Sequence, residues 1–240
     1  MPEPDPEANP HPIPVQVEER GAALSLLPVA ATLDYYALPD WLQSQPLVQF
    51  APQLIGYLAL ALWTTHNRSI VARLGLSKSQ WRIGTQLGLV TGVVLGCLNT
   101  LVILHLLPSW GWDITFLTRT PHAQVPVVIM VPWFIFMIAL LVEINFRGFL
   151  LGRLAALESS LWHSRALQRL SPLALLTSAL IFSFDPFMVA TFRHLHWIAV
   201  WDGLVWGLLW LLTRNLYATI VAHTIEVILM YGAVRGALMS

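Results

Sequence analysis

Charged side chains are scarce in this sequence. Only 11% of its 240 residues are Asp, Glu, Lys or Arg, while 56% are hydrophobic. A soluble domain usually carries about 25% charged residues and about 45–50% apolar ones. So little charge excludes an ordinary water-soluble domain, and so high an apolar content excludes disorder over most of the chain.

Two further shortages narrow the possible functions. The single cysteine, Cys97, can form neither an internal disulfide nor a cysteine-based zinc cluster. Basic residues are not in excess, because 13 Lys and Arg balance 13 Asp and Glu, so nothing favours a nucleic-acid partner. Nucleophile-elbow, zinc-protease and phosphate-loop motifs are also missing, and no pattern points to a particular metal or cofactor.

Composition divides the chain into three regions. Residues 1–20 are rich in acidic residues and proline, which predicts a disordered tail. Residues 21–44 are moderately apolar but interrupted by proline and aspartate, and we expect an interfacial or re-entrant segment there. Residues 45–240 carry the long apolar stretches of a transmembrane domain.

Six of these stretches reach the ~20 apolar residues that a spanning helix needs. They are residues 47–65, 83–107, 125–152, 173–191, 197–213 and 215–234. The predicted fold class is therefore an all-α, polytopic bundle of about six spanning helices, preceded by the N-terminal interfacial segment.

The basic residues predict how this bundle is oriented. Eight of the 13 lie in the connections at one end, in residues 66–82 and 153–172 and at Arg214, against four at the other end. Because basic loops favour the cytoplasmic side, we expect these connections in the cytoplasm and the amino terminus outside. The predicted location is a plasma or inner membrane.

Ionisable side chains inside the predicted spans are the strongest functional signal. Each costs at least about 2.5–3.5 kcal/mol on insertion scales, so its presence needs a reason. At ~1.5 Å rise per residue, most of them lie roughly 12–20 Å from the basic end, in one layer of the membrane. The set consists of Glu143, Arg147, Asp185, Asp202, His223 and Glu226.

Spacing predicts how these groups are arranged. Glu143 and Arg147 are four residues apart and His223 and Glu226 are three apart, so each pair shares a helix face. We expect Glu143 and His223 within one water-bridged contact, in a polar cavity shared with Glu226 or Asp185 and open to the cytoplasm. Alternatively, the charges only hold helices together. Because carboxyls outnumber the cations, some must be protonated, hydrated or bound to a cation.

One tryptophan pattern and one glycine pattern are expected to contribute to helix packing. The tryptophans at 197, 201, 206 and 210 should face lipid or a neighbouring helix. Gly88, Gly92 and Gly96 repeat every fourth residue, which is typical of a close helix–helix contact in membranes.

The segment VEINFRGFLLGRL resembles the E-E-x-x-F-R-G signature of the CPBP family, the intramembrane proteases related to the type II CAAX prenyl endopeptidase and bacteriocin-processing proteins. LTSALIF is similar to the start of that family's F-x-x-x-H motif. GLVWGLLWLLTRNLYATIVAHTI is similar to its G-L-x-x-G…T-x-S-L…H-x-x-x-N segment. The resemblance covers about residues 68–232. It implies a site for a membrane or prenylated peptide or protein, in contact with membrane lipid.

The resemblance also implies roles for individual residues, and the sequence departs from the family motifs at three positions. Glu143 matches the second glutamate of the first motif, and His223 matches the histidine of the third. Val142, Pro186 and Val227 stand where the family has a glutamate, a histidine and an asparagine. In active members the first glutamate and the second-motif histidine are taken to activate water, and the third-motif histidine and asparagine to support the oxyanion. The water-activating pair is therefore absent here.

The leading hypothesis is a CPBP-like endopeptidase. Glu143 would act as the base or orient it, His223 would donate a proton or stabilise the oxyanion, and Arg147 would keep Glu143 ionised. The departures predict poor cleavage of a prenylated CAAX peptide. They leave open a non-catalytic family member that binds or scaffolds a membrane partner. The excess of buried carboxyls leaves open a proton- or cation-handling protein.

One further match to F-x-x-x-H lies at residues 192–196 and ends at His196. Its expected place at the outer ends of the helices, away from Glu143 and His223, makes it a chance match.

Overall fold

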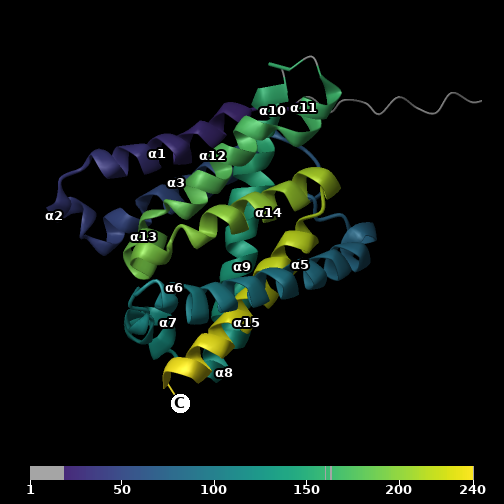
Figure 1. The fold of residues 1–240 in the computed structure, drawn as a ribbon. Helices are drawn as coiled ribbons and strands as arrows, with labels where there is room; N and C mark the ends of the chain where they lie inside the picture. The colour runs from purple at the N-terminus through teal and green to yellow at the C-terminus, as the bar shows by residue number, and fades with distance from the viewer. Residues whose placement is uncertain (1–18, 160, 163, 240) are drawn as a thin grey trace, which may run out of the picture.

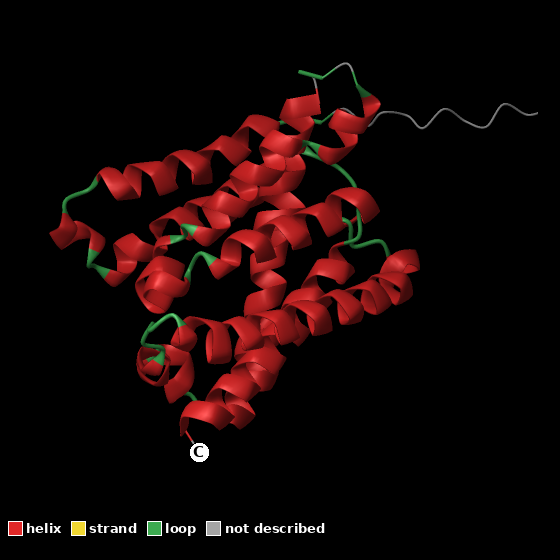
Figure 2. Ribbon diagram, in the orientation of Figure 1, coloured by secondary structure: helices red, strands yellow, loops and turns green. Residues whose placement is uncertain are grey.

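The computed structural model describes residues 19–159, 161–162 and 164–239, and it contains helices but no strand over this part of the chain. Figure 2 shows the helices joined by short loops. The α-helices are α1 (Leu26–Ala37), α2 (Asp40–Gln43), α3 (Pro46–His66), α4 (Ile70–Leu74), α5 (Trp81–Leu101), α6 (Leu107–Ser109), α7 (Pro121–Gln124), α8 (Val127–Ile129), α9 (Phe136–Glu143), α10 (Gly152–Ser159), α11 (Arg165–Leu170), α12 (Pro172–Ser183), α13 (Pro186–Phe192), α14 (Ile198–Thr213) and α15 (Leu216–Met239).

Tighter and wider turns extend these helices. Short 3₁₀ helices are η1 (Ala22–Ser25), η2 (Lys78–Gln80), η4 (Thr115–Arg119) and η7 (Arg193–Leu195). The π-helical segments are η3 (Val102–Leu106), η5 (Met130–Ile135) and η6 (Ile144–Leu151).

The described residues contain five helical stretches long and apolar enough to cross a membrane. They are Pro46–His66, Ile70–Ser109, Val127–Ser159, Arg165–Ser183 and Leu216–Met239. A sixth candidate is the pair Pro186–Leu195 and Ile198–Thr213, which is bent by 119°. The predicted all-α bundle of about six spans is therefore confirmed.

The fourth predicted span, 173–191, ends earlier than the sequence indicated. Its helix α12 stops at Ser183, and α13 starts anew at Pro186. The carboxylate of Asp185 caps α13 by accepting hydrogen bonds from two backbone N–H groups, of Phe187 and Met188. Proline suits the first helical position because it lacks an N–H and has a fixed φ. Pro186 therefore breaks the span.

At its amino-terminal side the chain is tied to the basic end of the bundle. The predicted tail over residues 1–20 lies outside the described residues except for Glu19 and Arg20. The carboxylate of Glu19 lies 2.6 Å from Nη1 of Arg73 and accepts a hydrogen bond of 2.7 Å from the indole of Trp63. In the predicted interfacial segment, η1 and α1 form an apolar helix too short to count as a span, and it lies along α3 (Figure 1).

The most extensive helix contact among the described residues joins α5 and α15 (Figure 1). A Cβ atom on Gly88 would lie 2.6 Å from the carbonyl oxygen of Ala218, and one on Gly92 would lie 2.6 Å from that of Ala222. Real Cβ atoms do not approach so closely, so only glycine permits this contact. The glycine row that the sequence indicated for helix packing is confirmed, and Gly84 extends it by one turn.

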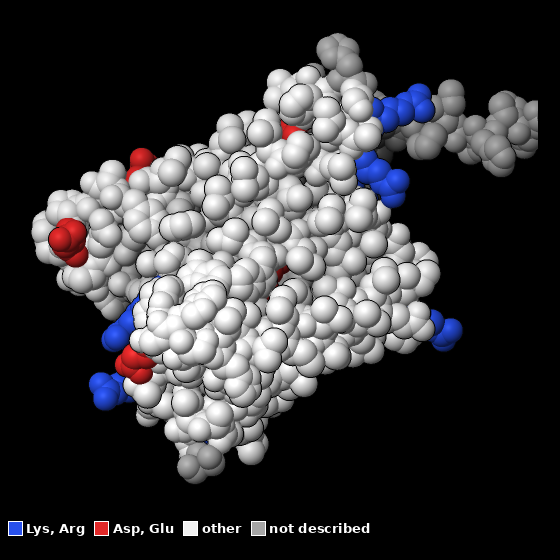
Figure 3. All heavy atoms as spheres, viewed as in Figure 1, with Lys and Arg blue, Asp and Glu red and all other residues white. Residues whose placement is uncertain are grey.

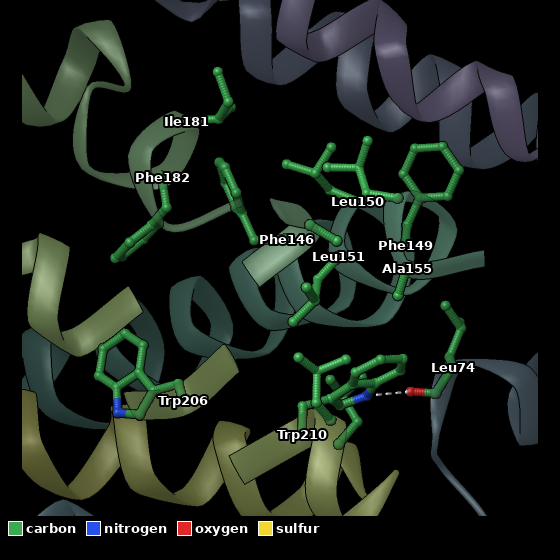
Figure 4. Packing of buried hydrophobic residues seen from close by; sticks show 14 of the residues in the cluster. Leu74, Phe146, Phe149, Leu150, Leu151, Ala155, Ile181, Phe182, Trp206 and Trp210 are labelled. Atoms are coloured by element: carbon green, nitrogen blue, oxygen red, sulfur yellow. Dashed lines mark hydrogen bonds between the residues drawn. The ribbon is translucent and has the colours of Figure 1, made fainter. Parts of the chain in front are cut away.

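The basic end is closed by an apolar core. Trp210, Phe149 and Leu216 are almost completely buried there. Figure 4 shows the indole of Trp210 donating a hydrogen bond of 3.2 Å to the backbone carbonyl of Leu74. The tryptophans at 206 and 210 thus pack against neighbouring helices, one of the two environments expected for this series.

Charged side chains on the face seen in Figure 3 gather near its edges, while its wide middle carries almost none. An uncharged middle band is what the hydrocarbon core of a bilayer requires. The chain is an integral, multi-pass membrane protein.

The glycine contact yields a stability prediction. Gly92→Ala should lower the free energy of unfolding by roughly 1–3 kcal/mol, because the new methyl group would meet the backbone of α15. The measurement is thermal unfolding of the purified protein in detergent. Gly232→Ala is the matched control, since a Cβ at Gly232 meets nothing within 4 Å. Equal melting temperatures of the two variants would contradict the close contact.

Candidate functional site

Glu143, Arg147 and His223 meet in the middle of the bundle. Oε1 of Glu143 accepts a hydrogen bond of 3.1 Å from Nη1 of Arg147 and lies 3.0 Å from Nδ1 of His223. The side chains of Glu143 and Arg147 are 0% and 1% exposed. Water therefore does not solvate either charge, and the carboxylate and the guanidinium compensate each other. The structure thus brings together the three residues that the sequence proposed as catalytic. Glu143 and His223 are in direct contact, without a bridging water molecule.

Aromatic rings hold this group from the other side. Figure 4 shows Phe182 and Trp206 facing the same region from α12 and α14. The guanidinium carbon of Arg147 lies 4.4 Å from the ring centre of Phe182 and 5.0 Å from that of Trp206. The ring of Trp206 stacks on His223, with 4.3 Å between centres and 22° between planes. These contacts fix the guanidinium of Arg147 and the imidazole of His223 in one orientation.

The helix changes its winding at this site. Residues Ile144–Leu151 are π-helical directly after Glu143, and this segment contains Arg147. Such wider turns are frequent at functional sites in helices. The segment is almost entirely buried, so its side chains pack inward around the whole turn.

A cavity of about 240 Å³ lies beside the group. Val142, Asp185, Asp202, His223 and Glu226 are among its lining residues, most of which are apolar. Glu143 and Arg147 are not among them. His223 therefore stands between the cavity and the buried ion pair.

The cavity extends away from the basic end. Its wall also includes Thr118, His122, His196 and Arg235, from connections and a helix end at the opposite end of the bundle. At this end burial lowers the pKa of His122, so its imidazole is neutral at pH 7. The expectation of a cavity open to the predicted cytoplasmic side is wrong, because the apolar core around Trp210 fills that end.

His196, which was expected to lie away from the site, shares a cavity with His223. Its Nδ1 contacts the backbone carbonyl of Arg193. Among the described residues it makes no hydrogen bond to Glu143 or His223.

A second polar cluster joins α5, α14 and α15. The amide Nδ2 of Asn99 lies 3.1 and 3.2 Å from the two carboxylate oxygens of Asp202 and 2.7 Å from Oε1 of Glu226. Its Oδ1 accepts a hydrogen bond of 2.9 Å from the indole of Trp201. All three polar side chains of the cluster are at most 5% exposed.

Sequence reasoning missed Asn99, although a signal for it exists. Asn99 follows Gly92 by seven residues and Gly96 by three, so it shares the glycine face of α5. A polar amide on a face that packs against another membrane helix needs a partner there. The two acids of α14 and α15 provide it.

Asp185 stands apart from both clusters. It lines the cavity, but its carboxylate caps α13. Across the described part of the chain, no three His, Cys, Asp or Glu residues are placed to hold a metal ion.

Residues 124–229 match the Type II CAAX prenyl endopeptidase Rce1-like family. All six ionisable residues indicated by the sequence lie within this range, whereas Asn99 lies outside it. No curated protein and no solved structure matches the chain.

The buried ion pair yields a second stability prediction. Arg147→Ala should lower the free energy of unfolding by ~3–5 kcal/mol, because it leaves the carboxylate of Glu143 uncompensated. The double variant Glu143→Gln with Arg147→Ala should be more stable than Arg147→Ala alone, since neither charge remains. Thermal unfolding in detergent measures both.

Arg165→Ala, at an exposed position of α11, is the control and should change little. If the single and double variants lose equal stability, the two charges are not coupled.

Proposed function

Because residues 124–229 belong to the Rce1-like family of type II CAAX prenyl endopeptidases, we propose that this chain binds a peptide segment in its membrane cavity and hydrolyses one peptide bond. The protein would act in a plasma or inner membrane, on a membrane or prenylated peptide or protein. The observation that carries the proposal is the contact of 3.0 Å between Nδ1 of His223 and Glu143, behind a cavity that His223 lines.

The burial of Glu143 assigns it the role of orienting residue. A carboxylate that is 0% exposed and absent from the cavity wall cannot reach a water molecule there. It can hold the proton of His223 on Nδ1, which leaves Nε2 as an acceptor. None of the described residues hydrogen-bonds Nε2. In this arrangement Arg147 keeps Glu143 ionised.

The reaction then needs only water and the peptide. Nε2 of His223 takes a proton from water while the water oxygen bonds to the carbonyl carbon, and the carbonyl π electrons move to its oxygen. As the carbonyl re-forms, the C–N bond breaks and its electron pair goes to nitrogen. The nitrogen receives the proton from His223, so the products are a carboxylic acid and an amine.

One observation favours a second candidate function, binding without cleavage. Val142 lines the cavity at the position where the family has a glutamate. A valine offers neither a base nor a hydrogen bond to water. Hydrolysis through His223 alone should therefore be slow.

A cleavage assay tests the proposal. The purified protein in liposomes should release fluorescence slowly from a fluorogenic prenyl-peptide, and His223→Ala should abolish the release. Glu143→Gln should reduce kcat, because an amide holds the imidazole in place without stabilising its protonated form. His194→Ala, at an exposed position outside the cavity wall, should leave the rate unchanged.

Saturable binding of the peptide with no cleavage above the His223→Ala level would reject hydrolysis. It would establish the binding function in its place.

A further inference from the structure

One face of helix α15 forms a continuous wall of the cavity and leads from His223 to an arginine near the end of the helix. Cavity-lining residues recur on this face every three or four positions, at His223, Val227, Met230 and Val234, and Arg235 adjoins the last of them. Such spacing keeps the side chains on one side of the helix. A peptide held at His223 can therefore follow this face as far as Arg235.

Arg235 is the only arginine or lysine among the described residues that line the cavity. Its Nη1 donates hydrogen bonds of 2.9 Å to the backbone carbonyl of Ala123 and of 3.0 Å to the hydroxyl of Tyr231. Both of these residues also line the cavity, so the guanidinium lies at the cavity wall.

The other edge of this guanidinium has no protein partner. Within the described part of the chain, no carboxylate forms an ion pair with Arg235, and no group accepts a hydrogen bond from its Nε or Nη2. Two parallel N–H groups on one edge of a guanidinium match the two oxygens of a carboxylate. The free edge of Arg235 is therefore suited to bind a carboxylate inside the cavity.

The charges of the cavity wall set the direction of a bound peptide. Near His223 the wall contains the carboxyl groups of Asp202 and Glu226, which share the amide nitrogen of Asn99. Carboxyl groups do not attract a carboxylate, whereas the guanidinium of Arg235 does. The negatively charged carboxyl terminus of a peptide is thus favoured at Arg235, and the chain runs from His223 toward it.

The length of this path is that of a few residues. His223 and Arg235 are 12 positions apart on α15, which is about 18 Å along the helix. An extended peptide covers ~3.3–3.6 Å per residue, so roughly five residues span this distance. Side chains on a helix lean toward its amino terminus, so the guanidinium reaches back toward His223 and shortens the path by about one or two residues.

On the basis of the proposed function, in which a peptide bond is cleaved at His223, we propose that Arg235 binds the C-terminal carboxylate of the peptide. Nε and Nη2 donate one hydrogen bond to each carboxylate oxygen, while Nη1 keeps its contacts with Ala123 and Tyr231. Arg235 is then a specificity-determining residue. It selects peptides that end about three to five residues after the cleaved bond.

Two prenyl-peptides test this role, one with a free carboxyl terminus four residues after the cleaved bond and one with the same terminus as an amide. In phosphatidylcholine liposomes the wild type should bind the acid about 10-fold or more tightly than the amide, the usual effect of a hydrogen bond to a charged group. Arg235→Gln should bind both peptides equally. Arg235→Lys keeps the charge without the paired N–H groups and should retain part of the preference.

The amide peptide and a second arginine are the controls. A variant that fails to fold loses both peptides, whereas loss of the carboxylate contact affects the acid alone. Arg119→Gln, at an exposed position outside the cavity wall, should keep the full preference for the acid. Extending the acid by four residues moves its carboxylate past Arg235, so the extended peptide should bind like the amide. Equal affinities of the wild type for acid and amide would overturn the proposal.

The kinetic constants separate binding of the carboxylate from a structural role. In Arg235→Gln the KM for the acid should rise about 10-fold or more, while kcat stays close to that of the wild type, because the contact is equally strong before and during bond cleavage. A fall in kcat for both peptides with no change in their relative KM would overturn the proposal.

Binding to His223→Ala, which does not cleave, distinguishes failure of this proposal from failure of hydrolysis. If the wild type cleaves neither peptide, but His223→Ala prefers the acid and added Arg235→Gln removes the preference, hydrolysis is rejected and the carboxylate site is supported. If cleavage depends on His223 while acid and amide bind equally, hydrolysis is supported and the carboxylate site is overturned.

A lipid carboxylate is the competing occupant, and oleate is its probe. Equal binding of the two peptides, together with oleate binding that Arg235→Gln abolishes, would overturn the proposal and assign Arg235 to a lipid. Binding of neither peptide would overturn both the carboxylate site and the proposed function.

Discussion

The positive charge of Arg147 has to be balanced inside the bundle, and the arrangement of the site follows from this constraint. A guanidinium that is 1% exposed needs a carboxylate at contact distance, and Glu143 supplies it from one turn away. The same carboxylate oxygen of Glu143 also contacts Nδ1 of His223. The aromatic rings of Phe182 and Trp206 then close the space that water would otherwise fill.

Helices α14 and α15 extend this arrangement as two pairs of side chains, one turn apart. Trp206 stacks on His223 in one pair, and Asp202 and Glu226 lie around the same amide nitrogen of Asn99 in the other. Asp202 and Trp206 are four residues apart and His223 and Glu226 three, so each helix contributes one face. Asn99 adds α5 to the second pair. Polar contacts between three helices thus lie next to the cavity instead of facing lipid.

The sequence predicted those contacts that depend on where a residue lies along its own helix. Contact between Glu143 and Arg147 follows from their spacing, and nearness of His223 follows from its depth in the membrane. Asn99 was missed because an amide carries no charge and does not stand out in an apolar span. A break of the fourth span is what proline at 186 favours, but the role of Asp185 was missed, because a residue taken as a buried acid serves as the helix cap of α13.

The direction of the cavity could not be predicted from the basic loops. Charge in the connections sets which end faces the cytoplasm, but the shape of the interior depends on side-chain volume. Large residues such as Trp210 and Phe149 fill the basic end, and only contacts between helices distant in sequence reveal this. For the same reason, residues 192–196 could not be placed on the cavity wall from sequence alone.

The glycine contact between α5 and α15 has a consequence for the shape of the cavity. Over several turns the glycines of α5 face backbone and side-chain atoms of α15 at close range. Sliding or separating the two helices would break all of these contacts at once, so the pair is held rigidly. A side chain at any glycine of this row would push the two helices apart, so the part of the cavity wall that α15 provides keeps its place only while the row stays glycine.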